Sequence, residues 1–213
     1  MIKRVIFDID NTLIPWEKEY YKEIKKVLEE LEIEYNENDY NKILEALSEY
    51  ENKYYSFDRK LMIDFINEYT KKSYPDELIY KTTKYWANCV PEKIDENIIK
   101  LLEYLKDKYE LVILTDWYED QQSERLEKIG ILKYFSKVFS AEKTKRKPFK
   151  EAFIRAIEEN KPEECIMIGD NFERDIKGAL NAGLKAVYYN PKGAEKSEDY
   201  YTISNLEELM NIL

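Results

Sequence analysis

The sequence of 213 residues contains no histidine. This absence excludes Ser-His-Asp and Cys-His nucleophile systems, HExxH zinc sites and any histidine general base. If the protein is an enzyme, its acid–base chemistry must come from Asp, Glu, Lys or Tyr side chains. A bound metal would be held by oxygen ligands, which suits Mg²⁺.

Cysteine is also scarce. Cys89 and Cys165 lie far apart and show no CxxC spacing, so we expect two reduced cysteines rather than a disulfide framework or a thiolate metal site. Long hydrophobic runs are missing too, since no apolar run approaches the roughly 18 residues of a membrane span. No signal-peptide pattern opens the chain. We therefore expect an intact cytoplasmic protein with no membrane partner.

Positive charge is in deficit, with 34 Lys and Arg against 44 Asp and Glu, a net charge of −10. Nonspecific binding to nucleic acid needs a basic face that neutralises phosphates, so the balance argues against a nucleic-acid partner. The one basic cluster is "KTKRKPFK" at residues 143–150. Because 44% of the residues are hydrophobic, the chain can bury a core in one domain with an insertion, or in two small domains.

Five short apolar runs predict buried strands. They are "RVIFDI" (4–9), "YELVILTD" (109–116), "KVFSA" (137–141), "ECIMIGD" (164–170) and "KAVYYN" (185–190). Helical spacing predicts helices between them, at 95–108, 119–129, 148–160, 175–181 and 204–213. Gly130 and Gly183 are expected to end two of these helices, and Ser204 to cap the last.

The segment from residue 16 to residue 91 has a different pattern. It predicts four helices, near 16–33, 38–52, 58–70 and 76–90, and no strand. Asn38, Asp58 and Asp76 are the expected N-caps of the last three helices. The fold class is therefore α/β, a Rossmann-like, mainly parallel sheet with helices on both faces and an inserted all-α domain. The expected boundaries are 1–15 and 92–213 for the core, and 16–91 for the insertion.

In open parallel sheets, ligands bind beyond the carboxyl ends of the strands. Carboxylates follow three of the predicted strands: Asp8 and Asp10 the first, Asp116 the second and Asp170 the fourth. Taken singly, such residues are more often turn formers or helix N-terminal charges, and a lone lysine or threonine near them is ordinary. Their convergence on one edge of the sheet favours a functional site.

Four motifs in order extend this convergence: "DIDNT", "VILTD", "RKP" and "GDNFERD". Together they resemble the motifs of the haloacid dehalogenase superfamily of phosphohydrolases, and the resemblance covers the whole chain. It implies that residues 16–91 are a helical type 1 cap that closes over the site and excludes water. The cap holds 11 of the 19 tyrosines, which we expect to pack its bundle.

The resemblance also implies roles for the residues at each motif. Asp8 would be the nucleophile that forms an aspartyl-phosphate, and Asp10 the general acid and base, with a raised pKa. Lys147 would tie the phosphate to Asp8 and balance charge, and Thr115 would hydrogen-bond a phosphoryl oxygen. Mg²⁺ would be bound by these ligands: the Asp8 carboxylate, the Asp10 backbone carbonyl, Asp170, and Asp175 directly or through water.

Four positions depart from the family pattern. Asp116 and Trp117 replace the usual Asn and Gly, Thr144 replaces a glycine before the lysine, and the lysine motif reads "KPFK" instead of K-P-x-P. A carboxylate at position 116 would repel phosphate unless it points away while its N–H group still binds the substrate. Trp16 and Trp117 lie within a few residues of a motif and are candidates to contact the substrate.

The resemblance implies a Mg²⁺-dependent phosphatase of a small phosphorylated metabolite, such as phosphoglycolate, glyceraldehyde 3-phosphate or a nucleoside monophosphate. An acid at Asp10 favours phosphoryl transfer, because halide leaves without protonation. Two alternatives stay open, a phosphomutase and a catalytically idle binding protein that keeps the fold. The oligomeric state is left open as well.

Overall fold

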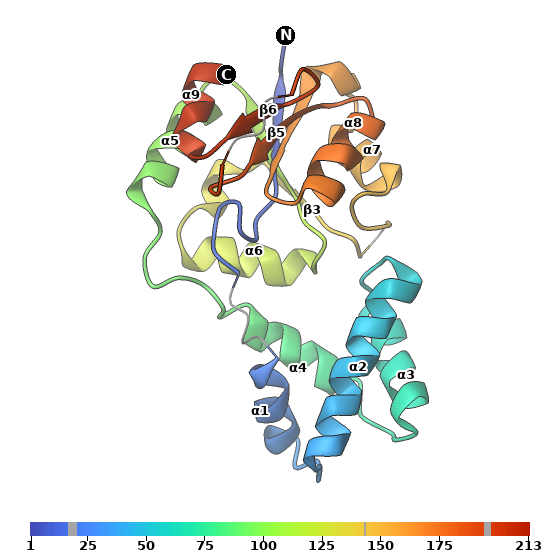
Figure 1. The fold of residues 1–213 in the computed structure, drawn as a ribbon. Coiled ribbons are helices and arrows are strands. Elements are labelled where there is room, and N and C mark those ends of the chain that lie inside the picture. The colour runs from blue at the N-terminus through green and yellow to red at the C-terminus, as the bar shows by residue number, and fades with distance from the viewer. Residues whose placement is uncertain (17–20, 143, 194–196) are drawn as a thin grey trace.

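The computed structural model describes residues 1–16, 21–142, 144–193 and 197–213. Its centre is one six-stranded sheet with the order β3-β2-β1-β4-β5-β6, in which all neighbouring strands are parallel (Figure 1). The strands are β1 (Arg4–Phe7), β2 (Glu110–Leu114), β3 (Lys137–Phe139), β4 (Cys165–Gly169), β5 (Lys185–Tyr189) and β6 (Tyr201–Ile203). The predicted parallel α/β sheet is confirmed.

Helices cover both faces of the sheet. Side chains alternate along a strand, so Val5 and Phe7 of β1 enter one hydrophobic cluster and Ile6 enters another. The first cluster includes leucines of α5 (Glu96–Lys106), α6 (Glu119–Lys128) and α9 (Leu209–Ile212). The second includes residues of α7 (Lys150–Ile157) and α8 (Gly178–Asn181). Burial on both faces explains why the central strands read as continuous apolar runs.

Four helices between the first two strands form a bundle beside the sheet (Figure 1). They are α1 (Lys22–Glu30), α2 (Glu37–Tyr54), α3 (Arg59–Thr70) and α4 (Glu77–Trp86). The bundle has its own hydrophobic cluster, in which Tyr50 and Trp86 are fully buried. The helical character of the insertion is thus as predicted, while the boundaries at residues 15/16 and 91/92 stay a prediction.

Details at the helix ends and one strand differ from the prediction. Asn36, not Asn38, caps α2, because its side chain accepts a hydrogen bond from the backbone N–H of Asp39 while Asp39 bonds back. Likewise Asn205, not Ser204, caps the C-terminal helical segment, accepting from Glu207 N. The strand β6 was not predicted. The first helix of the insertion, predicted from residue 16, starts at Lys22 in the structure. Residues 17–20 of the predicted helix lie outside the described residues.

Asp58, Asp76 and Gly130 lie at helix ends, as predicted. Asp58 caps α3 by accepting from Leu61 N at 2.8 Å. Asp76 precedes α4 but makes no capping hydrogen bond, and its carboxylate pairs with Lys60 instead. Gly130 follows α6 with φ +76°, a conformation that glycine adopts without strain. Within the described part of the chain, no helix is long and apolar enough to cross a membrane.

Candidate active site

The carboxyl ends of three central strands bring distant motifs together. Phe7 of β1 pairs with Ile113 of β2 on one side and with Ile168 of β4 on the other. The next residues along the chain are therefore neighbours at the edge of the sheet. This register places Asp8 between the ends of β2 and β4, as the alternation of strands and helices predicts.

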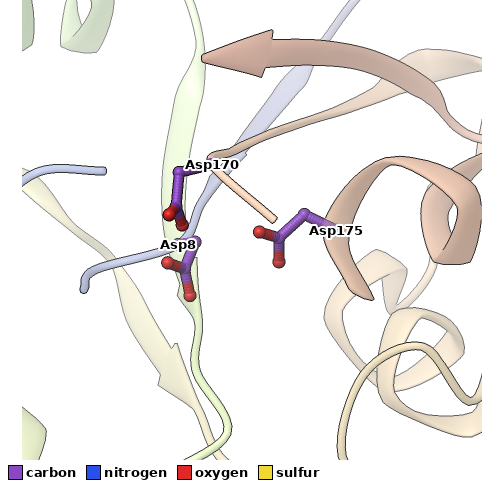
Figure 2. Close-up of side chains that lie close together, drawn as sticks. All are labelled: Asp8, Asp170 and Asp175. Carbon is purple, nitrogen blue, oxygen red and sulfur yellow. The ribbon is translucent and has the colours of Figure 1, made fainter. Parts of the chain in front are cut away.

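Three carboxylates meet at this edge. Asp8, Asp170 and Asp175 each offer an oxygen, and these oxygens all lie within 4.8 Å of one another (Figure 2). Asp175 comes from a π-helical turn, Phe172–Lys177, and its side chain accepts a hydrogen bond from Asn171 N at 3.0 Å. A Cβ at Gly169 would lie 2.3 Å from Asp175 Oδ2, so only glycine at the end of β4 lets this carboxylate approach.

Lys147 supplies the buried positive charge of the cluster. Its Nζ lies 2.6 Å from Asp8 Oδ1, to which it donates a hydrogen bond, and 2.7 Å from Asp175 Oδ1. The contact with Asp175 is an ion pair without hydrogen-bond geometry. Burial by itself would lower the pKa of Lys147, but Asp175 and Asp8 raise it well above its ordinary value. The lysine is therefore a permanent cation between two motifs.

The cluster holds three carboxylates and one cation, and the pKa values of Asp170 and Asp175 are raised. Burial, with the negative charge of Asp8, raises the pKa of Asp170 to about 6, and Lys147 opposes the shift. Burial and Asp8 also raise the pKa of Asp175, again against the effect of Lys147. An additional cation near the three carboxylates would relieve this repulsion.

Asp10 stands apart from the cluster although it lies two residues from Asp8. Arg125 Nη1 donates to Asp10 Oδ1 at 2.5 Å, and Gln122 Nε2 donates to Asp10 Oδ2 at 2.9 Å. Burial raises the pKa of Asp10, Arg125 lowers it, and the charge of Asp8 raises it, with a net increase. Burial, more than the neighbouring carboxylate that the sequence suggested, is therefore the main cause of the raised pKa of Asp10.

Two threonines contribute hydroxyl groups. Thr115, at the end of β2, is buried, and its Oγ1 accepts a hydrogen bond from Gln122 Nε2 at 3.0 Å. Because this bond uses a lone pair, the hydroxyl proton of Thr115 can be donated to another acceptor. Thr12 Oγ1 lies 3.4 Å from Asp8 Oδ2 and 3.5 Å from Asp170 Oδ1. Thr12 thus lies against two of the three carboxylates, and Thr115 lines the cavity of the site.

The carboxylate of Asp116 has a local structural task. Its Oδ1 accepts a hydrogen bond from the backbone N–H of Lys147 at 2.9 Å, and its Oδ2 lies 3.5 Å from Arg174 Nη1. Burial raises the pKa of Asp116, and Lys147 and Arg174 lower it. This unusual residue therefore fixes the lysine loop to the end of β2. Both oxygens of its side chain are engaged by these contacts.

These residues line a cavity of about 220 Å³. Its walls are Asp8, Asp10, Asn11, Trp16, Thr115, Asp116, Trp117, Lys147, Asp170, Asn171, Arg174 and Asp175. Trp16 and Trp117 form one wall and stack on each other, with ring centroids 5.4 Å apart and planes inclined by 27°. All seven residues predicted from the motifs are present in this one cavity.

Sequence reasoning did not assign roles to Gln122 and Arg125. Both lie on α6, 0% exposed, and both bind Asp10. The sequence of α6 is strongly polar throughout, so it does not distinguish the buried face of the helix from the face exposed to solvent. The available signal was the pairing of Gln and Arg at spacing i, i+3, which places them on one side of a helix.

The chemistry of the donor set fits Mg²⁺. Mg²⁺ takes oxygen ligands from one or two carboxylates together with water and phosphate oxygens. The cluster of Asp8, Asp170 and Asp175 is rich in oxygen ligands and carries excess negative charge. Among the described residues that line this cavity, side-chain nitrogen occurs only in the cations Lys147 and Arg174, the amides of Asn11 and Asn171 and the indoles of Trp16 and Trp117. None of these groups is a usual metal ligand, and none of these side chains contains sulfur.

The fold, with acidic residues at the carboxyl edge of a parallel sheet and a helical insertion after its first strand, is that of a haloacid dehalogenase-like protein. A sequence profile of haloacid dehalogenase-like hydrolases matches residues 5–189. The chain therefore belongs to the haloacid dehalogenase-like hydrolase family, as the motifs predict.

Solved structures show the same fold. The chain resembles the HAD phosphatase from Thermococcus onnurineus with a TM-score of 0.69 and 25% identity, over 99% of this chain and 97% of that one. It resembles YfnB from Bacillus subtilis, a structure bound to magnesium that reveals interdomain movement, with a TM-score of 0.67 and 22% identity over 99% and 98%. For a 2-haloacid dehalogenase from Pseudomonas syringae the TM-score is 0.74 at 22% identity, over 100% and 98%.

Several curated relatives are named as phosphatases or nucleotidases. The chain is 31% identical to N-acylneuraminate-9-phosphatase of Rattus norvegicus over 56% of this chain and 52% of that protein. It is 34% identical to the pyrimidine 5′-nucleotidase YjjG of Escherichia coli over 54% of each. For the glyceraldehyde 3-phosphate phosphatase of Pyrococcus furiosus the identity is 33%, over 53% and 51%. The matches span about half the length of these relatives.

Proposed function

We propose that the protein is a Mg²⁺-dependent phosphatase that hydrolyses a small phosphomonoester through an aspartyl-phosphate on Asp8. The observation that carries the proposal is the arrangement of the seven motif residues around one cavity. Asp8 contacts the buried cation Lys147, while Asp10 is held separately beside them. The names of the curated relatives support a phosphatase. Because these relatives are named for different substrates, the substrate of this chain is proposed from the size of the cavity.

In the first step, an oxygen of Asp8 attacks phosphorus and the ester oxygen leaves. Asp10 gives its proton to that oxygen, and afterwards takes a proton from the water that hydrolyses the aspartyl-phosphate. Lys147 holds Asp8 in place and neutralises charge at the phosphoryl group, to which Thr115 donates its hydroxyl proton. The backbone N–H of Asp116 is a further candidate donor to the phosphate.

The Asp8 carboxylate, the Asp10 backbone carbonyl, Asp170 and Asp175 are the residues that would hold Mg²⁺. When bound, Mg²⁺ would supply positive charge to the phosphoryl oxygens and offset the repulsion between an anionic ester and an anionic nucleophile. The clustering of three of these carboxylates within 4.8 Å supports this assignment.

The helical insertion would act as the cap of this site. We assign residues 16–91 to the cap and residues 1–15 and 92–213 to the core. Phe57 and Trp86 of the insertion contact Trp117 of the cavity wall, with ring centroids 5.1 and 5.2 Å away. Residues of the cap thus back the cavity on one side, which excludes water from the reacting groups.

The size of the cavity favours a short substrate. Its volume of about 220 Å³ lies below the range of roughly 300–1,000 Å³ in which drug-sized ligands bind. The phosphoryl group itself occupies part of this space. The cavity therefore holds a phosphoryl group and a few carbon atoms, as in glyceraldehyde 3-phosphate or phosphoglycolate, and a nucleotide or a sugar acid would extend beyond it.

Hydrolysis of p-nitrophenyl phosphate tests the proposal. We expect turnover in Mg²⁺ and a loss of about 100-fold or more when EDTA removes the metal, since metal charge stabilises the transition state by several kcal/mol. The same protein should release inorganic phosphate from glyceraldehyde 3-phosphate. Absence of Mg²⁺-dependent turnover would contradict the proposal, and formation of glucose 1,6-bisphosphate from glucose 1-phosphate would indicate a phosphomutase.

Trp117→Ala tests whether the tryptophan wall restricts the substrate. Removing this indole enlarges the cavity beside Trp16, so we expect the kcat/KM ratio of UMP to glyceraldehyde 3-phosphate to rise by about 10-fold, within the range by which pocket size discriminates substrates. Tyr80→Ala is the matched control, because Tyr80 is an exposed aromatic residue of α4. An unchanged ratio in Trp117→Ala would remove this residue from the pocket.

A further inference from the structure

Arg125 is a fully buried cation that belongs to none of the four motifs. Its side chain is 0% exposed, although arginine is among the residues least often buried completely. A buried charge is costly unless its partners satisfy it, and removing one partner of a buried pair is strongly destabilising. The partners of Arg125 therefore indicate what the residue is for.

These partners come from different parts of the chain. Nη1 donates to Asp10 Oδ1 at 2.5 Å and to Gln122 Oε1 at 2.8 Å. Nε donates to the backbone carbonyl of Cys89 at 2.9 Å. The guanidinium also lies over the ring of Trp16, 5.2 Å from its centroid.

Trp16 and Cys89 lie in the two segments that connect the sheet to the helical insertion. Trp16 follows the loop after β1, and Cys89 follows α4 on the return to the core. The guanidinium of Arg125 thus contacts both connecting segments and the carboxylate of Asp10. The planar guanidinium suits this task, because its donors point in fixed directions.

The carboxylate of Asp10 is held on both oxygens from a single helix. Arg125 binds Oδ1 and Gln122 binds Oδ2, while Gln122 also donates to Thr115 Oγ1. A misplacement of about 1 Å of a catalytic group is enough to cost on the order of 100-fold in rate. The orientation of Asp10 therefore depends on α6, which carries no catalytic motif residue.

We propose that Arg125 is a positioning residue that acts through Asp10. It holds this carboxylate where it reaches the leaving oxygen, and it joins that orientation to the two segments that lead into and out of the insertion. The inference rests on the proposed function, because it concerns the group that would protonate the leaving oxygen.

The test compares two substrates of the same shape. Phenyl phosphate has a basic leaving group that needs protonation, whereas p-nitrophenyl phosphate has a weakly basic one. For Arg125→Met we expect kcat/KM on phenyl phosphate to fall by about 100-fold, and on p-nitrophenyl phosphate by less than about 10-fold. Arg125→Lys keeps the charge and should recover part of the loss.

A double-mutant cycle separates positioning from structural damage. In the Asp10→Asn background, Arg125→Met should change the residual kcat/KM on phenyl phosphate by less than about 3-fold, against about 100-fold in the wild-type background, because residues that act as a unit are not additive. The matched control is Lys128→Met. Lys128 binds the carbonyl of Ala87 and the side chain of Asn88 from the same helix without contacting Asp10, so its loss should leave both substrates nearly unchanged.

Equal losses on the two substrates, or the same loss with and without Asp10, would overturn the inference while the proposed function stands. Thermal unfolding of each variant is measured alongside, and Arg125→Lys carries the comparison if Arg125→Met does not fold. A wild-type protein without Mg²⁺-dependent turnover would overturn the proposed function and the inference together.

Discussion

The Asp8→Asn variant is expected to lose at least about 10⁴-fold in kcat on p-nitrophenyl phosphate, as nucleophile removal does in other covalent mechanisms. The amide has the size of the carboxylate but cannot attack phosphorus. Asp8 is nearly buried and lies 2.6 Å from Lys147 Nζ, so its oxygen is fixed in the cavity. The measurement is steady-state hydrolysis at saturating Mg²⁺.

Glu173→Gln is the matched control for this experiment. Glu173 is a carboxylate in the same region, but its side chain is 68% exposed and pairs with Lys177. The same exchange of oxygen for nitrogen there should leave kcat within about 2-fold, since exposed ion pairs of this kind contribute little. If Asp8→Asn kept a tenth of the wild-type activity, Asp8 would not be the nucleophile.

The sheet was predictable because its strands are buried on both faces. Runs such as "RVIF" and "CIMIG" carry no polar residue apart from Arg4, and only strands or buried helices tolerate such runs. The strand β6 is different. It has three residues, "YTI", at the edge of the sheet, and it pairs with β5 alone. A strand so short depends on its neighbour, and local pattern does not reveal it.

The helix caps show a similar limit. Asn36 and Asn38 both precede the apolar spacing of α2, and either could cap it by residue type. The choice falls on Asn36 because Asp39 then occupies the third helical position and completes a reciprocal pair of hydrogen bonds. At the C-terminus, Glu208 bonds both Ser204 N and Asn205 N, so neighbouring polar residues share the capping role.

The acidic cluster followed from topology and the motifs, but the environment of Asp10 did not. Parallel strands put Asp8 and Asp170 side by side whatever the loops do. The contact of Arg125 with Asp10 joins residues 115 positions apart, and it depends on how α6 rotates against the sheet. Gln122 Nε2 and the Nε and Nη1 groups of Arg125 face inward because groups of the protein, not solvent, accept their hydrogen bonds.

The Lys147→Met variant is expected to lose both activity and stability. Met keeps most of the volume of the side chain but removes the cation between Asp8 and Asp175. Removing one partner of a buried ion pair costs about 3–5 kcal/mol, so the free energy of unfolding in EDTA at pH 8 should fall by roughly that amount. Loss of a charge that stabilises the transition state should lower kcat by about 10²–10³-fold.

The stability loss of Lys147→Met should shrink as the pH falls. In the wild type, burial and the charge of Asp8 already raise the pKa of Asp170 to about 6, above the value of about 3.9 in an unfolded chain. A carboxyl group with a raised folded pKa stabilises the protein below its unfolded pKa, and this contribution is lost as the pH rises through the folded pKa. Without Lys147 that pKa rises further, so the ionised carboxylates destabilise the variant most above pH 6.

Denaturant unfolding at pH 5 and pH 8, with and without Mg²⁺, distinguishes charge from packing. Protonation at pH 5, or Mg²⁺ at pH 8, should restore part of the lost stability, because each reduces the repulsion among the three carboxylates. Lys145→Met is the control: Lys145 is half-exposed and pairs with Glu151 outside the cluster. An equal loss at both pH values, unaffected by Mg²⁺, would mean that Lys147 stabilises the fold by packing alone.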